Sequence, residues 1–220
     1  QYYIFCDDDT GRRLRDALVA KAREGVEVRV LYDDVGCMRV KKAFFESMRA
    51  AGIEVCAFLH VKFPLLTSKV NYRNHRKIAV VDGLVGFIGG MNVADRYVRG
   101  TAQGVWRDTH FRVEGCGVAG LQASFLSDWS ATTRQNVSGP AYYPAAGRFT
   151  DNIMQVVASG PFGKWRTLLQ ADSFAVSRAA RRIWIETPYY LPSDALNMAL
   201  QEAALAGVDV RLMLPGHSDS

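Results

Sequence analysis

The sequence predicts a layered α/β/α sandwich around a mixed sheet, and two observations lead to this prediction. Helical and strand patterns alternate along the 220 residues, as they do in α/β domains. Two apolar segments joined by the turn dipeptide Asp82-Gly83 add an antiparallel hairpin, so the sheet is not purely parallel. A hydrophobic fraction of 49% supports a sizeable core and argues against disorder.

The first part of the chain supplies most of the expected sheet. Leu14, Leu18 and Ala22 recur every four residues and Gly25 follows, which indicates an amphipathic helix that ends just before the glycine. Apolar runs and further helical spacings define the other elements. We expect strands at 2–5, 26–31, 53–58 and 109–113, helices at 11–24, 40–51 and 118–132, and the hairpin at 78–88.

A Gly, Pro and Ser-rich stretch separates two expected units of the chain. We assign 1–134 to the first unit, 135–152 to a connecting loop and 153–220 to the second unit. In the second unit we expect strands at 154–158, 183–186 and 208–214, and helices at 165–180 and 194–205. The alternating pattern of the first unit therefore starts again in the second.

The two units also share sequence. "ALVAKAREGVEVRVLYDD" from Ala17 aligns without gaps to "ALQEAALAGVDVRLMLPG" from Ala199, with seven identities in eighteen positions. This pattern predicts pseudo-repeated halves, although any helix, glycine, strand unit gives some similarity. His75 lies 50 residues after Gly25, so a matching histidine would fall 50 residues after Gly207, near position 257. We therefore expect the 220 residues to be part of a longer enzyme.

Composition narrows the classes of function only slightly. The net charge of +5 suits nucleic acid, phospholipid headgroups or no specific partner about equally well. The four cysteines are scattered, which favours a reducing compartment over a disulfide scaffold and gives no zinc pattern. No apolar run reaches the length of a membrane span, and the first residues do not resemble a signal peptide. On these grounds the 220 residues are expected to be soluble.

Chemistry is concentrated in the segment "NHRKIAVVDG", which begins at Asn74. On an extended segment, His75 and Lys77 point to the same side because side chains alternate with a period of two. Gly89 and Gly90 permit a close backbone approach to a ligand, and Asn92 adds an amide donor for an oxyanion. This set favours phosphoryl chemistry with histidine as the nucleophile, without a metal or other cofactor.

The motifs "HRKIAVVDG" and "GFIGGMN" resemble the first HKD motif of the phospholipase D superfamily, and "WRD", "ASGP" and "TPYYLPSDAL" resemble its bacterial cardiolipin synthases. The resemblance implies a phospholipase D-like fold in which two HKD motifs from pseudo-repeated halves share one active site. It implies His75 as the nucleophile or as its acid and base partner, and Lys77 and Asn92 as phosphate ligands. Asp82 would complete the catalytic motif, chiefly by supporting its turn.

The family resemblance also implies a role for Asp108 in "WRD". This carboxylate falls where the family places one that orients an imidazole, expected here to be the imidazole of the absent half. An ordinary aspartate at a strand edge is an equally good interpretation. The remaining histidines, His60, His110 and His217, have no partner visible in the sequence and are interpreted as ordinary core or surface residues.

The resemblance implies a phosphatidyltransferase that joins two phosphatidylglycerols and releases glycerol. Its partners would be anionic phospholipid, a membrane surface on the cytoplasmic side of the cell membrane and the absent half with the second HKD motif, but not nucleic acid. Phe63, Leu65 and Leu66, flanked by Lys62 and Lys69, would either touch lipid or form a packed loop. Alternatives are a phospholipase D family phosphodiesterase or nuclease, a homodimer with one motif per chain, and a degenerate binding module.

Overall fold

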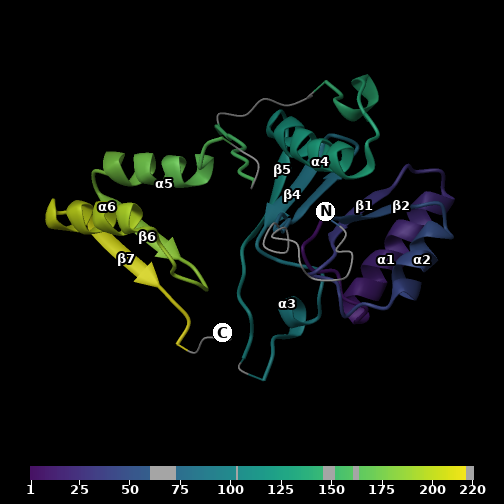
Figure 1. Cartoon of the computed structure of the whole chain (residues 1–220), viewed down its shortest axis with the longest axis horizontal. Helices are drawn as coiled ribbons and strands as arrows, with labels where there is room; N and C mark the ends of the chain where they lie inside the picture. The colour runs from purple at the N-terminus through teal and green to yellow at the C-terminus, as the bar shows by residue number, and fades with distance from the viewer. Residues whose placement is uncertain (60–72, 103, 146–151, 161–163, 217–220) are drawn as a thin grey trace. The chain divides into compact units, whose positions relative to one another are not determined.

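The protein is described by a computed structural model covering residues 1–59, 73–102, 104–145, 152–160 and 164–216. The expected lipid-contacting loop, His60 and His217 lie outside these residues. The chain divides into two compact units, Gln1–Val156 and Val157–Ser220, and each is described by itself. Both units consist of helices and strands, and the predicted α/β class is confirmed (Figure 1).

The sheet of the first unit has a parallel part and an antiparallel part. The strands β1 (Arg29–Asp33) and β2 (Glu54–Phe58) pair in parallel, whereas β4 (Val85–Gly89) pairs antiparallel with both β3 (Ile78–Val81) and β5 (His110–Glu114). The first six residues join the two parts. Tyr2 exchanges backbone hydrogen bonds with β1, and Gln1 exchanges them with Ile78 of β3. The strand ladders thus form two sheets, β1–β2 and β3–β4–β5, and this segment joins them into the predicted mixed arrangement through an isolated bridge and backbone hydrogen bonds.

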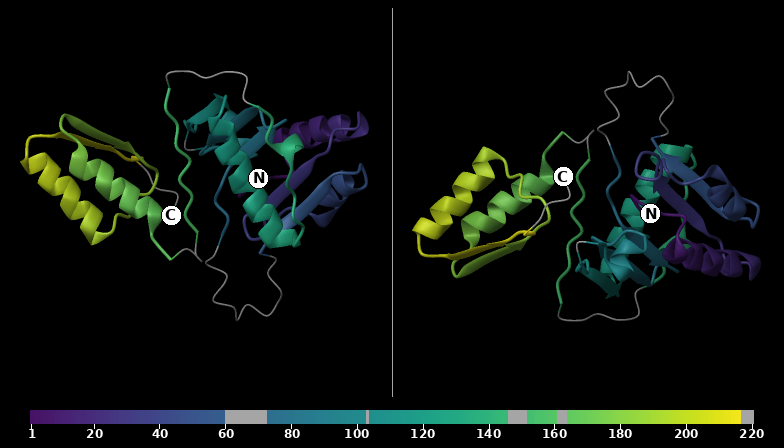
Figure 2. Two further views of the ribbon diagram at one scale, coloured as in Figure 1. Left: turned by 90° about the horizontal axis from the view of Figure 1, so that it is seen from above. Right: turned by 90° about the horizontal axis from the view of Figure 1, so that it is seen from below.

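Helices cover both faces of this sheet. The helices α1 (Asp9–Arg23) and α2 (Lys42–Arg49) share one apolar cluster with β1 and β2, in which Phe44, Phe45 and Met48 of α2 are buried. On the opposite face, α4 (Gly117–Thr133) brings Leu121 against Gly86 of β4 and buries Trp129. Among the described residues of this unit, two short helical elements remain: α3 (Arg96–Arg99) and η2 (Pro140–Tyr142). The layers thus follow the order α/β/α (Figures 1 and 2).

The second unit is a smaller version of the same alternation. Its helices α5 (Thr167–Arg178) and α6 (Asp194–Leu205) pack together, and α6 also packs on β7 (Asp209–Met213) (Figure 2). β7 pairs in parallel with β6 (Arg182–Glu186). Large apolar side chains of the two strands remain exposed, with Trp184 at 59% and Met213 at 65%. Among the described residues of this unit, helices therefore leave part of the strand surface uncovered.

The hairpin prediction is confirmed in detail. The turn between β3 and β4 places Asp82 at φ 54° and Gly83 at φ 67°, and the backbone nitrogen of Leu84 donates to the carbonyl of Val81. Two successive residues with positive φ define a type I′ turn, which matches the twist of an antiparallel pair. The Asp-Gly dipeptide thus fixes both the turn and the strand register.

Two strand predictions need correction. Residues 154–158 form no strand, because Met154 and Val156 pack against Gly117 and Gly120 of α4, where a Cβ atom would come within 2.8 Å of either side chain. Their apolar pattern thus reflects packing on a helix. Residues 2–5 form isolated parallel bridges, from Tyr2 to Tyr32 and from Phe5 to Val93, in place of a continuous strand. The other predicted elements are confirmed with small shifts at their ends.

Candidate active site

The segment that enters β3 brings an imidazole and an ammonium into direct contact. Lys77 Nζ lies 2.9 Å from His75 Nδ1 and donates to the His75 carbonyl oxygen at 2.8 Å. The ring of Tyr3 covers one side of the pair, with its centroid 4.7 Å from the His75 ring and 5.5 Å from Lys77 Nζ. The prediction that the two side chains share one side of the backbone is confirmed.

The neighbouring side chains point the other way and attach the segment to α4. Asn74 Nδ2 donates to Asp128 Oδ2 at 2.9 Å, and an Arg76 guanidinium nitrogen donates to the same oxygen at 2.7 Å. Gln1 Nε2 also donates to this oxygen at 2.5 Å. The residues on both sides of His75 are therefore held by one carboxylate, which fixes the direction of the imidazole.

A second carboxylate holds the backbone just before His75. Asp33, at the carboxyl end of β1, is buried and accepts a hydrogen bond from the backbone nitrogen of Asn74 at 2.9 Å. Its other oxygen accepts from the backbone nitrogens of Val35 and Gly36 at 3.0 and 2.9 Å. The loop after β1 and the segment before β3 are thereby joined through one buried anion, which satisfies three backbone donors.

Burial shifts the protonation of both side chains. Burial lowers the pKa of Lys77 to about 8, and the negative charge of Asp108 partly opposes this shift. Desolvation lowers the pKa of His75, and the positive charge of Lys77 lowers it further, while Asp33 acts in the opposite direction. A neutral imidazole is thus favoured at neutral pH, as a nucleophile or a general base requires.

Asn92 belongs to the same region but is fixed by its own partners. Its Oδ1 atom accepts from the backbone nitrogen of Ile4 at 3.0 Å, and its Nδ2 atom donates to the hydroxyl of Tyr97 at 2.7 Å. The side chain is buried. Because an amide nitrogen carries two hydrogens, one N–H of Asn92 is still available for an oxyanion.

Gly89, the last residue of β4, and Gly90, which follows it, make room for β5 and the residues before it. A Cβ atom on Gly90 would lie 2.3 Å from an oxygen of Asp108, and one on Gly89 would lie 2.3 Å from the Thr109 carbonyl oxygen. Asp108 also opposes the lowering of the pKa of both Lys77 and His110. Asp108 therefore lies near the ammonium of Lys77 and beside Gly90.

Asp82 lies at a different place from the other predicted site residues. It is exposed at the tip of the β3–β4 turn, beyond the end of β3 that is distant from Lys77. The structure thus brings His75, Lys77 and Asp108 close together and holds Asn92 against the backbone of Ile4, next to Tyr3, but places Asp82 apart from them. Within the described residues, no three His, Cys, Asp or Glu side chains gather as metal ligands would.

The sequence analysis missed two residues that position the site, Asp33 and Asp128. One signal for Asp33 was present, because the dipeptide Asp33-Asp34 directly follows an apolar strand, where α/β folds place functional groups. Asp128 lies on the largely apolar helix α4 and has no comparable signal. Its role depends on contacts across more than 50 residues of sequence.

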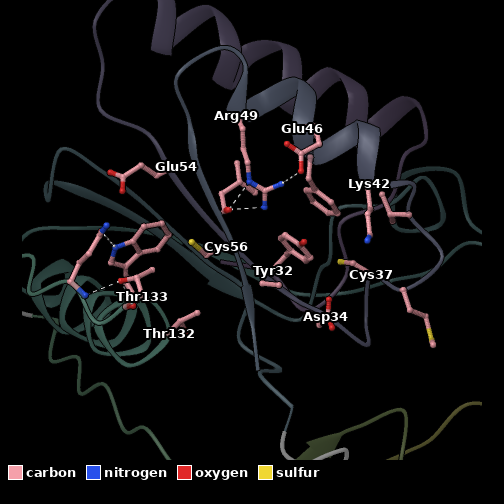
Figure 3. A pocket seen from close by; sticks show the side chains of 17 residues that line it. Tyr32, Asp34, Cys37, Lys42, Glu46, Arg49, Glu54, Cys56, Thr132 and Thr133 are labelled. Carbon is pink, nitrogen blue, oxygen red and sulfur yellow. Dashed lines mark hydrogen bonds and ion pairs between the residues drawn. The ribbon is translucent and has the colours of Figure 1, made fainter. Parts of the chain in front are cut away.

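An open pocket of ≈ 790 Å³ lies elsewhere in the first unit. It is lined by residues of α2, β1, β2 and the end of α4, including Tyr32, Arg49, Cys56 and Thr133 (Figure 3). Arg49 donates to the Val55 carbonyl oxygen and pairs with Glu46 along its wall. None of the predicted site residues lines this pocket, so we locate the candidate site by its chemistry and not by cavity size.

The architecture and the His75–Lys77 pair define a phospholipase D-like domain. The solved phosphatidylserine synthase of Haemophilus influenzae Rd KW20 has this similar fold, with a TM-score of 0.68 and 14% identity over 97% of this chain and 55% of that one. Residues 1–106 match the family described as "Cardiolipin synthase, PLD-like domain". Residues 1–106 therefore carry a phospholipase D-like domain of this family.

The relatives in sequence carry the same description. The chain is 44% identical to cardiolipin synthase 2 of Bacillus cereus and 41% identical to the major cardiolipin synthase ClsA of Bacillus subtilis, over its whole length in both cases. It spans 43% and 46% of these two proteins. Among the described residues, no helix is long and apolar enough to cross a membrane.

Proposed function

We propose that the 220 residues act within a longer phosphatidyltransferase that makes cardiolipin from two phosphatidylglycerols and releases glycerol. The observation that carries this proposal is the contact of 2.9 Å between Lys77 Nζ and His75 Nδ1, in a chain more than 40% identical to cardiolipin synthases over its whole length. A histidine and a cation in contact can together bind and attack a phosphodiester.

In the first step, His75 Nε2 attacks the phosphorus of one phosphatidylglycerol. Lys77 and Asn92 hold the equatorial oxygens, and the bond from phosphorus to the glycerol oxygen breaks as that oxygen takes a proton from a second imidazole. In the second step, a hydroxyl of another phosphatidylglycerol loses its proton to this imidazole and attacks the phosphohistidine. The phosphorus–nitrogen bond then breaks, which restores His75 and releases cardiolipin.

The resting contact between Lys77 and His75 sets a condition on the first step. With Nδ1 facing the ammonium, a neutral His75 ring carries its proton on Nε2, so that atom has no free lone pair. A bound phosphate would attract Lys77 Nζ to its oxygens and leave Nδ1 free to hold the proton. Substrate binding and activation of His75 are therefore coupled through Lys77.

The remaining site residues have supporting roles in this proposal. Gly89 and Gly90 permit the close approach of Asp108, which would orient the second imidazole. Asp82 supports the type I′ turn at the end of β3. We place the second imidazole in chain beyond the 220 residues, because the sequence relatives are more than twice as long. A twofold homodimer that pairs two copies of His75 is the alternative source.

The lipid substrate places the working protein at the cytoplasmic surface of the cell membrane. The net charge of +5 is compatible with binding to anionic lipid headgroups at a membrane surface. The competing proposal is a phospholipase D family nuclease that uses the same residues on nucleic acid. The identities with cardiolipin synthases along the whole chain support the lipid substrate.

One experiment separates these functions. The longer protein, its His75→Ala variant and the 220-residue chain are each mixed with phosphatidylglycerol vesicles or with supercoiled plasmid. We expect the longer protein to release cardiolipin and glycerol in equal amounts, the variant to lose several orders of magnitude in rate, and the 220-residue monomer to be inactive. Nicked plasmid without cardiolipin would support the nuclease, and more than about a tenth of the wild-type rate in the variant would exclude His75 as nucleophile.

A further inference from the structure

Arg96, the first residue of α3, packs against two aromatic rings that are in contact with each other. Its guanidinium carbon is 5.6 Å from the centroid of the Tyr97 ring and 5.4 Å from that of the Trp106 ring, and the two rings meet edge to face at 5.2 Å. Its Nε atom is buried without a hydrogen-bond partner in the described part of the chain. A buried donor without an acceptor is costly and calls for an explanation.

The nearby arginine of the same helix shows that carboxylates are available here. Arg99 forms an ion pair with Asp9 at 2.7 Å and another with Asp95 at 3.6 Å. Asp95 also accepts from the backbone nitrogen and the hydroxyl of Thr10. Among the described residues, Arg96 has rings as neighbours but no carboxylate in an ion pair. Its charge is therefore held in place without being neutralised, which suits an anion from outside the chain.

The position of Arg96 connects it to the candidate site. The hydroxyl of Tyr97, whose ring stacks with Arg96, accepts the hydrogen bond from Asn92 Nδ2 at 2.7 Å. One aromatic ring thus separates the guanidinium from the amide that would hold the reacting phosphate. An anion on Arg96 would lie beside the reacting phosphorus but would not occupy the same place.

This position suits the second lipid of the proposed reaction. The acceptor phosphatidylglycerol brings its own phosphodiester, which is separated from its attacking hydroxyl by a single glycerol. A guanidinium binds such a phosphodiester through two parallel hydrogen bonds. We propose that Arg96 binds the phosphodiester of the acceptor headgroup and so selects phosphatidylglycerol over uncharged alcohols; this inference rests on the proposed function.

A competition between two acceptors tests the proposal. Phosphatidylglycerol vesicles are incubated with the longer protein at a fixed ethanol concentration, and cardiolipin and phosphatidylethanol are quantified together. Arg96→Met keeps an apolar side chain against the two rings but removes the charge. We expect the ratio of cardiolipin to phosphatidylethanol to fall about tenfold, as loss of a hydrogen bond to a charged group implies. Arg96→Lys should restore part of the ratio.

Arg99→Met is the matched control, since this exposed arginine of the same helix is paired with carboxylates and should leave the ratio unchanged. An unchanged ratio in Arg96→Met, or an equal fall of both products, would overturn the acceptor site. A wild-type protein that forms neither product would instead overturn the proposed function, and this inference with it. The two failures are thus distinguishable.

A binding measurement does not depend on the variant. The 220-residue chain is titrated with glycerophosphoglycerol, the water-soluble headgroup, and separately with glycerol, while the Arg96 Nε–H signal is followed by NMR. A shift of this signal with glycerophosphoglycerol alone supports the site. No shift, or an equal shift with glycerol, contradicts it. An equal shift with inorganic phosphate would contradict the selection of a headgroup.

Discussion

The helix and strand pairs α1–β1 and α6–β7 show the same local structure in different surroundings. Both helices end in the same way, with Gly25 at φ 90° and Gly207 at φ 91°. In each, the next residue donates back to a carbonyl five positions earlier, Val26 to Lys21 and Val208 to Ala203, both at 3.0 Å. β1 is largely buried, whereas most of β7 is exposed.

The difference teaches that the shared sequence specifies the cap, while the neighbouring elements specify the burial. The cap depends on a glycine that adopts positive φ, which both segments supply. The burial of β1 depends on the helices that surround it in the first unit. The described part of the second unit has fewer helices around β7. The equal caps support our proposal that the two units are pseudo-repeats. The unequal burial supports the proposal that further chain covers β6 and β7.

The largest expected difference between the two pairs is in core stability. Leu31 is 1% exposed and its aligned counterpart Met213 is 65% exposed. We expect Leu31→Ala to reduce the free energy of unfolding by about 2–5 kcal/mol and Met213→Ala to change it by less than about 0.5 kcal/mol. Urea denaturation of the 220-residue chain measures both values.

Leu31→Ala and Met213→Ala also test whether chain outside the 220 residues covers β7. In the longer protein, burial of β7 would raise the cost of Met213→Ala toward that of Leu31→Ala. A cost that stays small in the longer protein would contradict our proposal that additional chain packs on this strand.

The second expected difference concerns catalysis. Asp33 ends β1 and fixes the backbone before His75, whereas its aligned residue in the second unit is Pro215. We expect Asp33→Asn in the longer protein to lower kcat about a hundredfold, because a small displacement of a reacting group has this effect. Asp82→Asn is the control and should alter kcat less than about threefold, since Asn also tolerates positive φ. Thermal melts check that both variants fold.

Sequence patterns predicted one part of this site and missed the other for a physical reason. The common side of His75 and Lys77 follows from local geometry, since alternation along an extended backbone needs no other element. The contacts of Asp33 with Asn74 and of Asp128 with Arg76 join residues far apart in sequence. Local periodicity contains no information on such contacts. The same limit explains residues 154–158, whose apolar pattern does not reveal that they pack on a helix.

A smaller effect on stability is expected at the ends of α1 and α6, where the two helix and strand pairs have the same structure. Alanine at Gly25 or at Gly207 would meet no atom within 4 Å, so the cost is the backbone strain of positive φ alone. We expect each substitution to cost about 1 kcal/mol, and the two costs to be equal within about 0.5 kcal/mol. Chemical denaturation followed separately in the two units measures this. Clearly unequal costs would show that the caps differ in more than their geometry indicates.

The smallest expected effect is on the titration of His75 in the 220-residue chain. Because the charge of Lys77 lowers the pKa of His75, Lys77→Met should raise that pKa, although burial still holds it down. The imidazole would then become protonated at a higher pH than in the wild type. An NMR titration of the ring signals measures the shift. A pKa that falls or does not change in Lys77→Met would contradict the electrostatic contact.

The central position of residues 1–6 has a consequence for how the protein folds. These residues precede β1 and β3 in the chain and join the two strands, although Ile78 of β3 follows Gln1 by 77 positions. The sheet of the first unit therefore cannot close until β3 has left the ribosome. Pairing over such a sequence distance raises the contact order, which slows folding. Until then the parallel pair keeps an open edge, and chaperones that bind open sheet edges would protect the nascent chain at this stage.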